Sequence, residues 1–138
     1  MSHVFKVGDG QSFRIKEDFY KLLGTESLAV QRSLYDLKNG DFIWSGALSE
    51  DGKSVNDGWT NTLSSDHKTI TMKNDDIALF NDKMTENVKM GADTARWVVF
   101  AKSARQEDYI FLGVFKYADG SPADGKLILN RMSEKYPT

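Results

Sequence analysis

Tryptophans set in polar or strand-ending positions are the residues of this chain best suited to hold a ligand. Trp59 stands among Asn, Asp, Gly and Thr residues, where periodic burial in a core does not explain it. Trp44 ends a short apolar run. An indole offers a flat π face on which a nucleic-acid base can stack. We predict that Trp44 and Trp59 line a ligand pocket, with Asp41 or Asn61 hydrogen-bonding the ligand's edge. In the alternative interpretation, Trp59 folds back into the core, as we expect for Trp97.

Basic side chains occur at intervals along the C-terminal third of the chain. Arg96 and Lys102 have the same parity in a predicted strand and should share one of its faces. Arg131 ends an otherwise apolar segment. We predict that these three residues contact phosphate oxygens of a nucleic acid. Solvated positions on an outer face are the alternative.

Hydrolytic and metal chemistry find little support in the residue types. His3 and His67 are the only histidines, and they form no spaced ligand pair. No serine lies in a Gly-x-Ser-x-Gly turn, and cysteine is absent. We therefore assign no catalytic residue, no metal and no cofactor, and lean toward a protein that is not an enzyme.

A metal-dependent nuclease remains a further alternative. Asp124 and Lys126 have the Asp-x-Lys spacing, with Asp108 and Asp119 upstream, and carboxylates near a lysine could hold Mg²⁺. However, Asp-Gly pairs recur along the chain, and this pair is a favoured turn sequence.

Size and charge limit the class of protein. The 138 residues predict one domain, residues 1–138, and lack both a long apolar run and the pattern of a signal peptide. We expect a cytoplasmic protein without membrane contact. The formal net charge is −2, so binding of nucleic acid must come from a local patch and a pocket.

Alternation of apolar and polar residues predicts a β-rich fold with few helices. A helix is expected over 17–23, and a second from Thr25 or Ser27 to a stop at Gly40. Residues 74–94 are left open between a short helix, an irregular crossing and a strand. The fold class is α+β: a curled, mostly antiparallel β-sheet or small β-barrel with one or two N-terminal helices. Strands are predicted at 4–7, 12–16, 41–44, 69–73, 95–102, 109–116 and 126–132, with the strand at 12–16 as the candidate partner of the strand at 4–7.

Both faces of the segment 109–116 are apolar. Phe111, Phe115 and Tyr117 share one parity, and Leu112 and Val114 share the other. One face must therefore be covered by the N-terminal helices or by another subunit. The second possibility gives our second functional hypothesis, a self-associating interaction domain that could be a homodimer.

Gly113 interrupts this otherwise regular strand. Glycine inside a strand often marks a bulge or a sharp bend of the sheet. We predict such a bulge at Gly113, which would help the sheet to curl.

The C-terminal strands also resemble a known family. Arg96-Trp97-Val98-Val99-Phe100, Tyr109-Ile110-Phe111-Leu112-Gly113-Val114-Phe115 and Asn130-Arg131-Met132-Ser133 resemble the strands of PUA-like domains, which include the SRA, EVE and ASCH groups. The likeness covers residues 96–133 and is greatest to modules attached to bacterial restriction endonucleases. It implies a bacterial or phage module that reads a nucleic-acid base, often modified or flipped, in an aromatic pocket.

Overall fold

A computed structural model describes residues 4–25, 33–49, 58–103, 106–122 and 124–137, with the side chains of 103, 106 and 107 excepted. The two helices and nine strands of this part follow one another along the chain in this order: β1 Phe5–Lys6, α1 Lys16–Leu22, β2 Leu34–Asp36, β3 Asp41–Ala47, β4 Trp59–Leu63, β5 Thr69–Asn74, α2 Ile77–Met90, β6 Arg96–Ser103, β7 Gln106–Tyr117, β8 Lys126–Ser133 and β9 Lys135–Tyr136.

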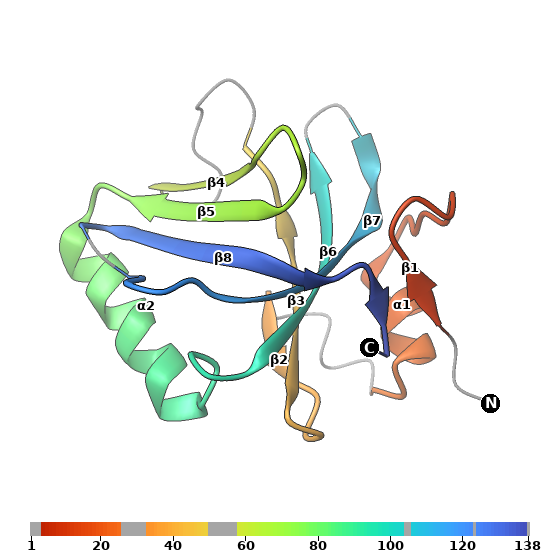
Figure 1. Cartoon of the computed structure of the whole chain (residues 1–138), viewed down its shortest axis with the longest axis horizontal. Helices are drawn as coiled ribbons and strands as arrows, with labels where there is room; N and C mark the ends of the chain where they lie inside the picture. Colours follow the sequence, from red (N-terminus) through yellow and green to blue (C-terminus); the bar gives the residue numbers. More distant parts are fainter. Residues whose placement is uncertain (1–3, 26–32, 50–57, 104–105, 123, 138) are drawn as a thin grey trace.

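Seven of the strands form one curled sheet in the order β2-β3-β6-β7-β8-β5-β4 (Figure 1). Only the β3–β6 pair in this sheet is parallel, among the strands that the structure describes. The β4–β5–β8 half crosses the β3–β6 half at a steep angle (Figure 1). This confirms the predicted α+β class with a mostly antiparallel, curled sheet. The sheet is not closed into a barrel, because β2 and β4 end it without pairing with each other.

The sheet has an apolar cluster on each face. One cluster contains Trp44 and Trp97 and is covered by α2 through Phe80 and Met84. The other lies beneath α1 and the small β1–β9 sheet, which contribute the residues Phe5, Phe19, Tyr20 and Tyr136. Elements of the same chain therefore cover both apolar faces of β7. The burial of Trp97, of which 2% is exposed, confirms its predicted place in the core.

The predicted bulge at Gly113 is confirmed, and it changes the faces of β7. In the ladder with β6, Val99 is paired with Gly113 but Phe100 with Phe111, so Leu112 is the extra residue. A bulge shifts the alternation of side chains by one position. Phe111 therefore packs in the cluster under α1, whereas Phe115 packs in the cluster under α2. The predicted common face for Phe111, Phe115 and Tyr117 is wrong for this reason.

The N-terminal strand pairs with a different partner from the one we predicted. Phe5–Lys6 pairs with Tyr136 and Lys135 of β9, and not with residues 12–16. Of those residues, Phe13 forms only an isolated bridge to Tyr109, and α1 begins at Lys16. Local alternation could not reveal a partner some 130 positions away in the sequence, because strand pairing is decided by tertiary packing.

The second predicted helix is wrong where the structure describes it. Leu34–Asp36 is strand β2, which forms a hairpin with β3, while residues 26–32 of that prediction lie outside the described residues. The turn between the strands has φ angles of 62° at Lys38 and 93° at Gly40, so Gly40 serves this hairpin and not a helix end. Leu34 lies opposite Trp44 in the ladder, and its burial beside that indole outweighs its helical propensity.

The segment 74–94, whose secondary structure the sequence left undecided, contains the long helix α2. The Asp76 side chain caps it by accepting a hydrogen bond from the Leu79 N–H at 3.1 Å, and Gly91 ends it with a left-handed φ of 81°. Its buried residues are Phe80, Met84 and Asn87. Neither helix in the described ranges is long and apolar enough to cross a membrane.

Candidate functional site

A cavity of about 130 Å³ lies inside the curl of the sheet, between α2 and the strands at the two ends of the sheet order. Its wall combines three tryptophans with amide and ammonium groups in a mainly apolar surround. Ligand sites in proteins have this composition, with a few polar groups placed in a largely apolar wall. The lining residues are Ser33, Leu34, Trp44, Gly46, Ala47, Trp59, Asn61, Met72, Lys83, Met84, Asn87, Trp97 and Leu127.

Both tryptophans that we predicted to bind a ligand, Trp44 and Trp59, lie in this wall. The indole of Trp44 crosses the backbone of Gly46, where an added Cβ would stand 2.5 Å from its Cζ2 atom. Only glycine at position 46 therefore lets this indole lie flat along β3. Trp59 is half-buried and packs on Phe80 of α2 with ring centroids 6.0 Å apart. Trp59 thus touches the core and faces the cavity at the same time.

Asn61 holds the two ends of the sheet together at the cavity. Its Nδ2 donates to the Ala47 carbonyl at 3.1 Å, and its backbone N–H donates to the Ser49 Oγ at 2.9 Å. The Ser49 N–H in turn donates to the Asn61 carbonyl at 2.7 Å. These bonds join the end of β3 and the residues just after it to β4, and no ladder within the described ranges pairs these two strands. Asn61 therefore lines the cavity and also links the strands that shape it, while its hydrogen bond to a ligand's edge stays a prediction.

Helix α2 supplies two polar lining residues that the sequence reasoning missed. Lys83 is half-exposed, and its ammonium lies 3.8 Å from the Glu86 carboxylate, an exposed ion pair of little strength. Asn87 is 2% exposed, and its Nδ2 donates to the Tyr117 hydroxyl at 3.0 Å. The capping residue Asp76 and the terminal Gly91 were the sequence signals for this helix. Because the segment between these two signals is only weakly hydrophobic, its sequence shows no clear helical periodicity.

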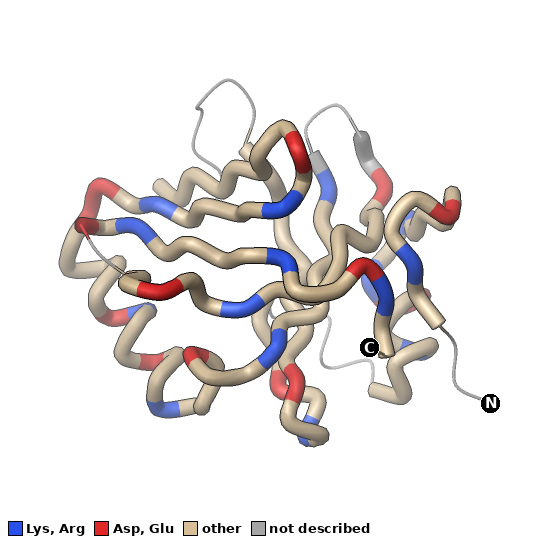
Figure 2. Tube along the Cα trace, in the orientation of Figure 1, with Lys and Arg blue, Asp and Glu red and all other residues tan. Residues whose placement is uncertain are grey.

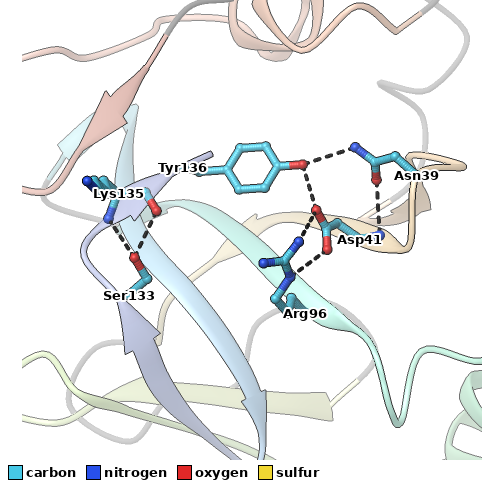
Figure 3. A network of polar contacts seen from close by, with 6 residues as sticks. All are labelled: Asn39, Asp41, Arg96, Ser133, Lys135 and Tyr136. Atoms are coloured by element: carbon cyan, nitrogen blue, oxygen red, sulfur yellow. Dashed lines mark hydrogen bonds and ion pairs between the residues drawn. The ribbon is translucent and has the colours of Figure 1, made fainter. Parts of the chain in front are cut away.

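Asp41 and Arg96 pair with each other and do not line the cavity. The two residues are register partners in the parallel β3–β6 ladder. The Arg96 guanidinium donates to both Asp41 oxygens, at 2.8 and 3.1 Å, and the Tyr136 hydroxyl also donates to Asp41, at 2.8 Å (Figure 3). Asn39 completes the network by donating to the Tyr136 oxygen (Figure 3). This network ties the C-terminus of the described chain to the main sheet.

Tyr136 makes the network sensitive to alkaline pH. Burial, and then the hydrogen bond to Asp41, raise the pKa of Tyr136 above its ordinary value of 10.0. A raised pKa in the folded state means that the tyrosine's contribution to stability is complete below pH 10.0 and is lost as the pH rises through the folded value. We expect the unfolding free energy, measured in urea, to fall as the pH rises above 10.0.

Tyr136→Phe should flatten this alkaline decline, because the variant lacks the titrating hydroxyl. Burial also raises the pKa values of Tyr20 and Tyr117, so part of the slope should remain. An identical slope in the parent and the variant would contradict the prediction for Tyr136.

Lys102 lies at the opposite end of β6 from Arg96, beside a second lysine. The Lys102 and Lys16 ammonium groups lie 5.2 and 5.9 Å from the centroid of the Tyr109 ring. Burial, and then the like charge of Lys102, lower the pKa of Lys16. Two cations on one aromatic ring form a local positive site that an anion would stabilise. Lys102 is also the register partner of Ala47, which lines the cavity.

Comparison with known proteins identifies the family. The sequence profile of the SET and RING associated (SRA) domain matches residues 3–138, nearly the whole chain. The chain belongs to the SRA domain family. No curated protein matches it in sequence. Among solved structures, the 5-hydroxymethylcytosine-specific restriction enzyme AbaSI is similar in fold, with a TM-score of 0.71 and 21% sequence identity over 96% of this chain. The match spans 41% of that enzyme.

Arg131 stands apart from the other predicted phosphate ligands of this SRA domain. Its Cγ and Cδ atoms pack against the backbone of Gly113, and its guanidinium lies 3.4 Å from the Glu134 carboxylate. Arg96, Lys102 and Arg131 therefore occupy three different places: the Asp41 network, the Tyr109 site and the Gly113 bulge. Strand parity predicts a shared face for Arg96 and Lys102, but six residues of extended chain place them roughly 20 Å apart.

The aspartates considered for a nuclease do not gather in the SRA domain. Within the ranges that the structure describes, no three His, Asp or Glu side chains lie close enough together to hold a cation, and these ranges include Asp108, Asp119 and Asp124. Asp124 has a φ of 54°, which is typical of a turn. The geometry thus gives no support to the nuclease alternative.

Proposed function

We propose that this SRA domain is a non-catalytic module that binds nucleic acid and takes one base, modified or flipped from its stack, into the cavity beside Trp44 and Trp59. The observation that carries this proposal is the joint presence of Trp44, Trp59 and Lys83 in the lining of one concave site. A cavity of about 150 Å³ holds a benzene ring. The cavity of about 130 Å³ is therefore on the scale of a single-ring base.

The charge distribution agrees with recognition through a pocket and a few local contacts. Lys and Arg positions are interspersed with Asp and Glu positions over the fold, and the formal net charge is −2 (Figure 2). A strong, sequence-independent attraction to DNA requires a dense basic surface. Binding should therefore depend on the base in the cavity, helped by the cations at Lys83 and Lys102.

The direct test is a titration with DNA duplexes that differ at one base. The structurally similar restriction enzyme is named for 5-hydroxymethylcytosine. We therefore suggest duplexes with one cytosine, 5-methylcytosine or 5-hydroxymethylcytosine, titrated at low and moderate salt. Binding should change tryptophan fluorescence, since three tryptophans line the cavity. Absence of binding to every duplex at both salt concentrations, without any fluorescence change, would refute the proposal.

Trp59→Ala should weaken binding of the preferred duplex by about 5- to 150-fold, the usual contribution of one base–aromatic stack. The residue is half-buried at the edge of the cavity, so the domain should still fold. Trp59→Phe is the matched control, because phenylalanine keeps a π face and should retain most of the affinity. Equal affinities for the parent and Trp59→Ala would remove Trp59 from the site.

Lys102→Gln should reduce the salt dependence of binding without changing the preference among bases. One lost phosphate contact lowers the slope of log K against log salt by about 0.9 for duplex DNA. Lys89→Gln, an exposed position in the last turn of α2, is the control and should leave the slope unchanged. A slope that Lys102→Gln does not alter would show that Lys102 contacts no phosphate.

A homodimer stays a prediction. The apolar faces of β7 that suggested it are covered within the chain by α1, β1 and β9 on one side and by α2 on the other. Light scattering at high protein concentration tests it, and a strict monomer would contradict it.

A further inference from the structure

A second hollow lies on the other face of the sheet, around the ring of Tyr109. Its volume is about 310 Å³, and it lies where the segment leading into α1 meets the end of β6 and the start of β7. Tyr109 belongs to the apolar cluster under α1, whereas Trp44 and Met84 of the cavity belong to the cluster under α2. The two hollows are therefore separate. The lining residues of the second are Arg14, Ile15, Lys16, Glu17, Lys102 and Tyr109.

The backbone and a neighbouring ring hold Tyr109 in place. Its N–H donates to the Phe13 carbonyl at 2.7 Å, and its carbonyl accepts from the Phe13 N–H at 2.9 Å. The Phe19 ring of α1 packs on it with centroids 5.4 Å apart, and only 7% of Tyr109 is exposed. Phe13 and Phe19 thereby attach the chain to Tyr109 on both sides of Lys16. The Lys16 ammonium thus has a defined place over the ring, 5.9 Å from its centroid.

Lys102 approaches the same ring from an irregular part of the β6–β7 ladder. Between two regular pairs of this ladder, residues 107–109 of β7 lie opposite Lys102 alone. Irregularities of this kind redirect side chains and are frequent beside functional sites. The Lys102 ammonium lies 5.2 Å from the centroid of Tyr109. Two separate elements of the fold therefore each bring a cation to one aromatic ring.

Neither lysine is neutralised by a carboxylate within the described residues. No ion pair joins either ammonium to an acidic side chain there, although Glu17 contributes to the lining. Burial, and then the like charge of Lys102, lower the pKa of Lys16, so the two cations repel each other. The tyrosine ring attracts cations through its quadrupole but carries no net charge to offset this repulsion. An anion beside both ammonium groups would offset it.

We propose that Lys16, Lys102 and Tyr109 form a second ligand site, which binds one phosphate group. Each ammonium group has three donors and no acceptor. A phosphate group carries several acceptor oxygens and up to two negative charges, so it can accept hydrogen bonds from both lysines at once. Two sources offer such a group, the backbone of a nucleic acid and a small phosphorylated ligand. The first source rests on the proposed function, whereas the site itself requires no base in the cavity.

The place of the site in the sheet favours the nucleic-acid backbone. Lys102 is the register partner of Ala47 in the parallel β3–β6 ladder, and Ala47 lines the cavity. Neighbouring strands lie roughly 5 Å apart. The cavity and the phosphate site are therefore at the same end of these strands, on opposite faces. A nucleic acid that placed one base in the cavity would have a backbone phosphate within reach of Lys102, and Lys16 would be the second cation on that phosphate.

Titration with inorganic phosphate tests the site without nucleic acid. The backbone amide NMR signals of Lys16, Lys102 and Tyr109 should shift in a saturable way, and sodium chloride at the same ionic strength should not reproduce the shift. Lys16→Gln should weaken phosphate binding at least about fivefold, because it removes one of two charge-assisted contacts. Lys16→Arg keeps the cation and should retain the affinity.

Lys21→Gln, an exposed position in the last turn of α1, is the matched control and should bind phosphate as the parent does. A parent whose signals do not respond to phosphate would overturn the proposal. Equal losses of affinity in Lys16→Gln and Lys21→Gln would also overturn it, because they would show a general attraction to lysines.

The salt dependence of duplex binding identifies the source of the phosphate. If the group belongs to the DNA backbone, Lys16→Gln should lower the slope of log K against log salt by about 0.9 and leave the preference among bases unchanged. An unchanged slope in a variant that has lost inorganic phosphate would assign the site to a small phosphorylated ligand. If no duplex binds the parent, the proposed function fails, and the phosphate titration still decides whether the site exists.

Discussion

Gly113→Val should destabilise the domain by about 3 kcal/mol or more, the largest loss that we expect from a single substitution. Gly113 has a φ of 122°, in the region where a side chain is strained. A Cβ built there would lie 2.8 Å from the Ser133 carbonyl oxygen and 2.6 Å from the Arg131 Cδ. The backbone oxygen belongs to the neighbouring strand β8 and cannot move without breaking the ladder.

Strain and crowding can be separated with a second glycine. Gly120 also has a positive φ, of 78°, but an added Cβ meets nothing within 4 Å. Gly120→Val should therefore cost only the backbone strain, about 1–2 kcal/mol. Denaturant unfolding of both variants measures the difference. Equal losses for the two would mean that the close approach of β8 to Gly113 contributes nothing.

Arg96→Met should lower the unfolding free energy by about 2–4 kcal/mol, because it leaves the Asp41 carboxylate without its charged partner. The Asp41 side chain is 4% exposed, while that of Arg96 is 37% exposed. Removal of a partner from a fully buried pair costs slightly more, and the exposure of Arg96 reduces the effect. The Tyr136 hydroxyl continues to donate to Asp41 and limits the loss.

The double variant Asp41→Asn/Arg96→Met is the matched control. A neutral amide does not require a cation, so the double variant should be more stable than Arg96→Met alone. If Arg96→Met instead keeps the parent's stability and loses affinity for duplex DNA, Arg96 acts on a phosphate as the sequence alone predicts.

The alternation of apolar residues was sufficient to predict the C-terminal strands and the fold class. Val98, Val99, Phe100 and their counterparts in β7 bury side chains on both faces of a strand, and this demand appears directly in the residue types. The bulge at Gly113 was predictable for a similarly local reason, since glycine in a strand interior is otherwise unfavourable. Trp44, Trp59 and Asn61, which the sequence offered as ligand-contacting residues, all line the cavity. The signal was an indole that stands among polar residues or ends an apolar run, which periodic burial in a core does not explain.

Only the tertiary structure decided which strands pair with one another and in which register. Leu34 became a strand residue because it pairs with Trp44, and Asp41 became a buried ion-pair partner because parallel pairing places Arg96 beside it. The sequence states the chemistry of Asp41 but not which strand lies next to β3. Register and partner are set by packing over long sequence separations.

Asn87, which lines the cavity, shows most clearly the difference between what the sequence predicts and what the tertiary structure decides. Its residue type was visible from the start, but a helix of low hydrophobicity around it gave a weak periodic signal. The fold placed that helix against the curl of the sheet, satisfied the Asn87 nitrogen through Tyr117 and left the oxygen buried and unpaired. The sequence by itself thus determined the strands, the bulge and the aromatic walls. The sheet's curl decided which polar residues line the cavity, because residues distant in the chain meet there only after long-range packing.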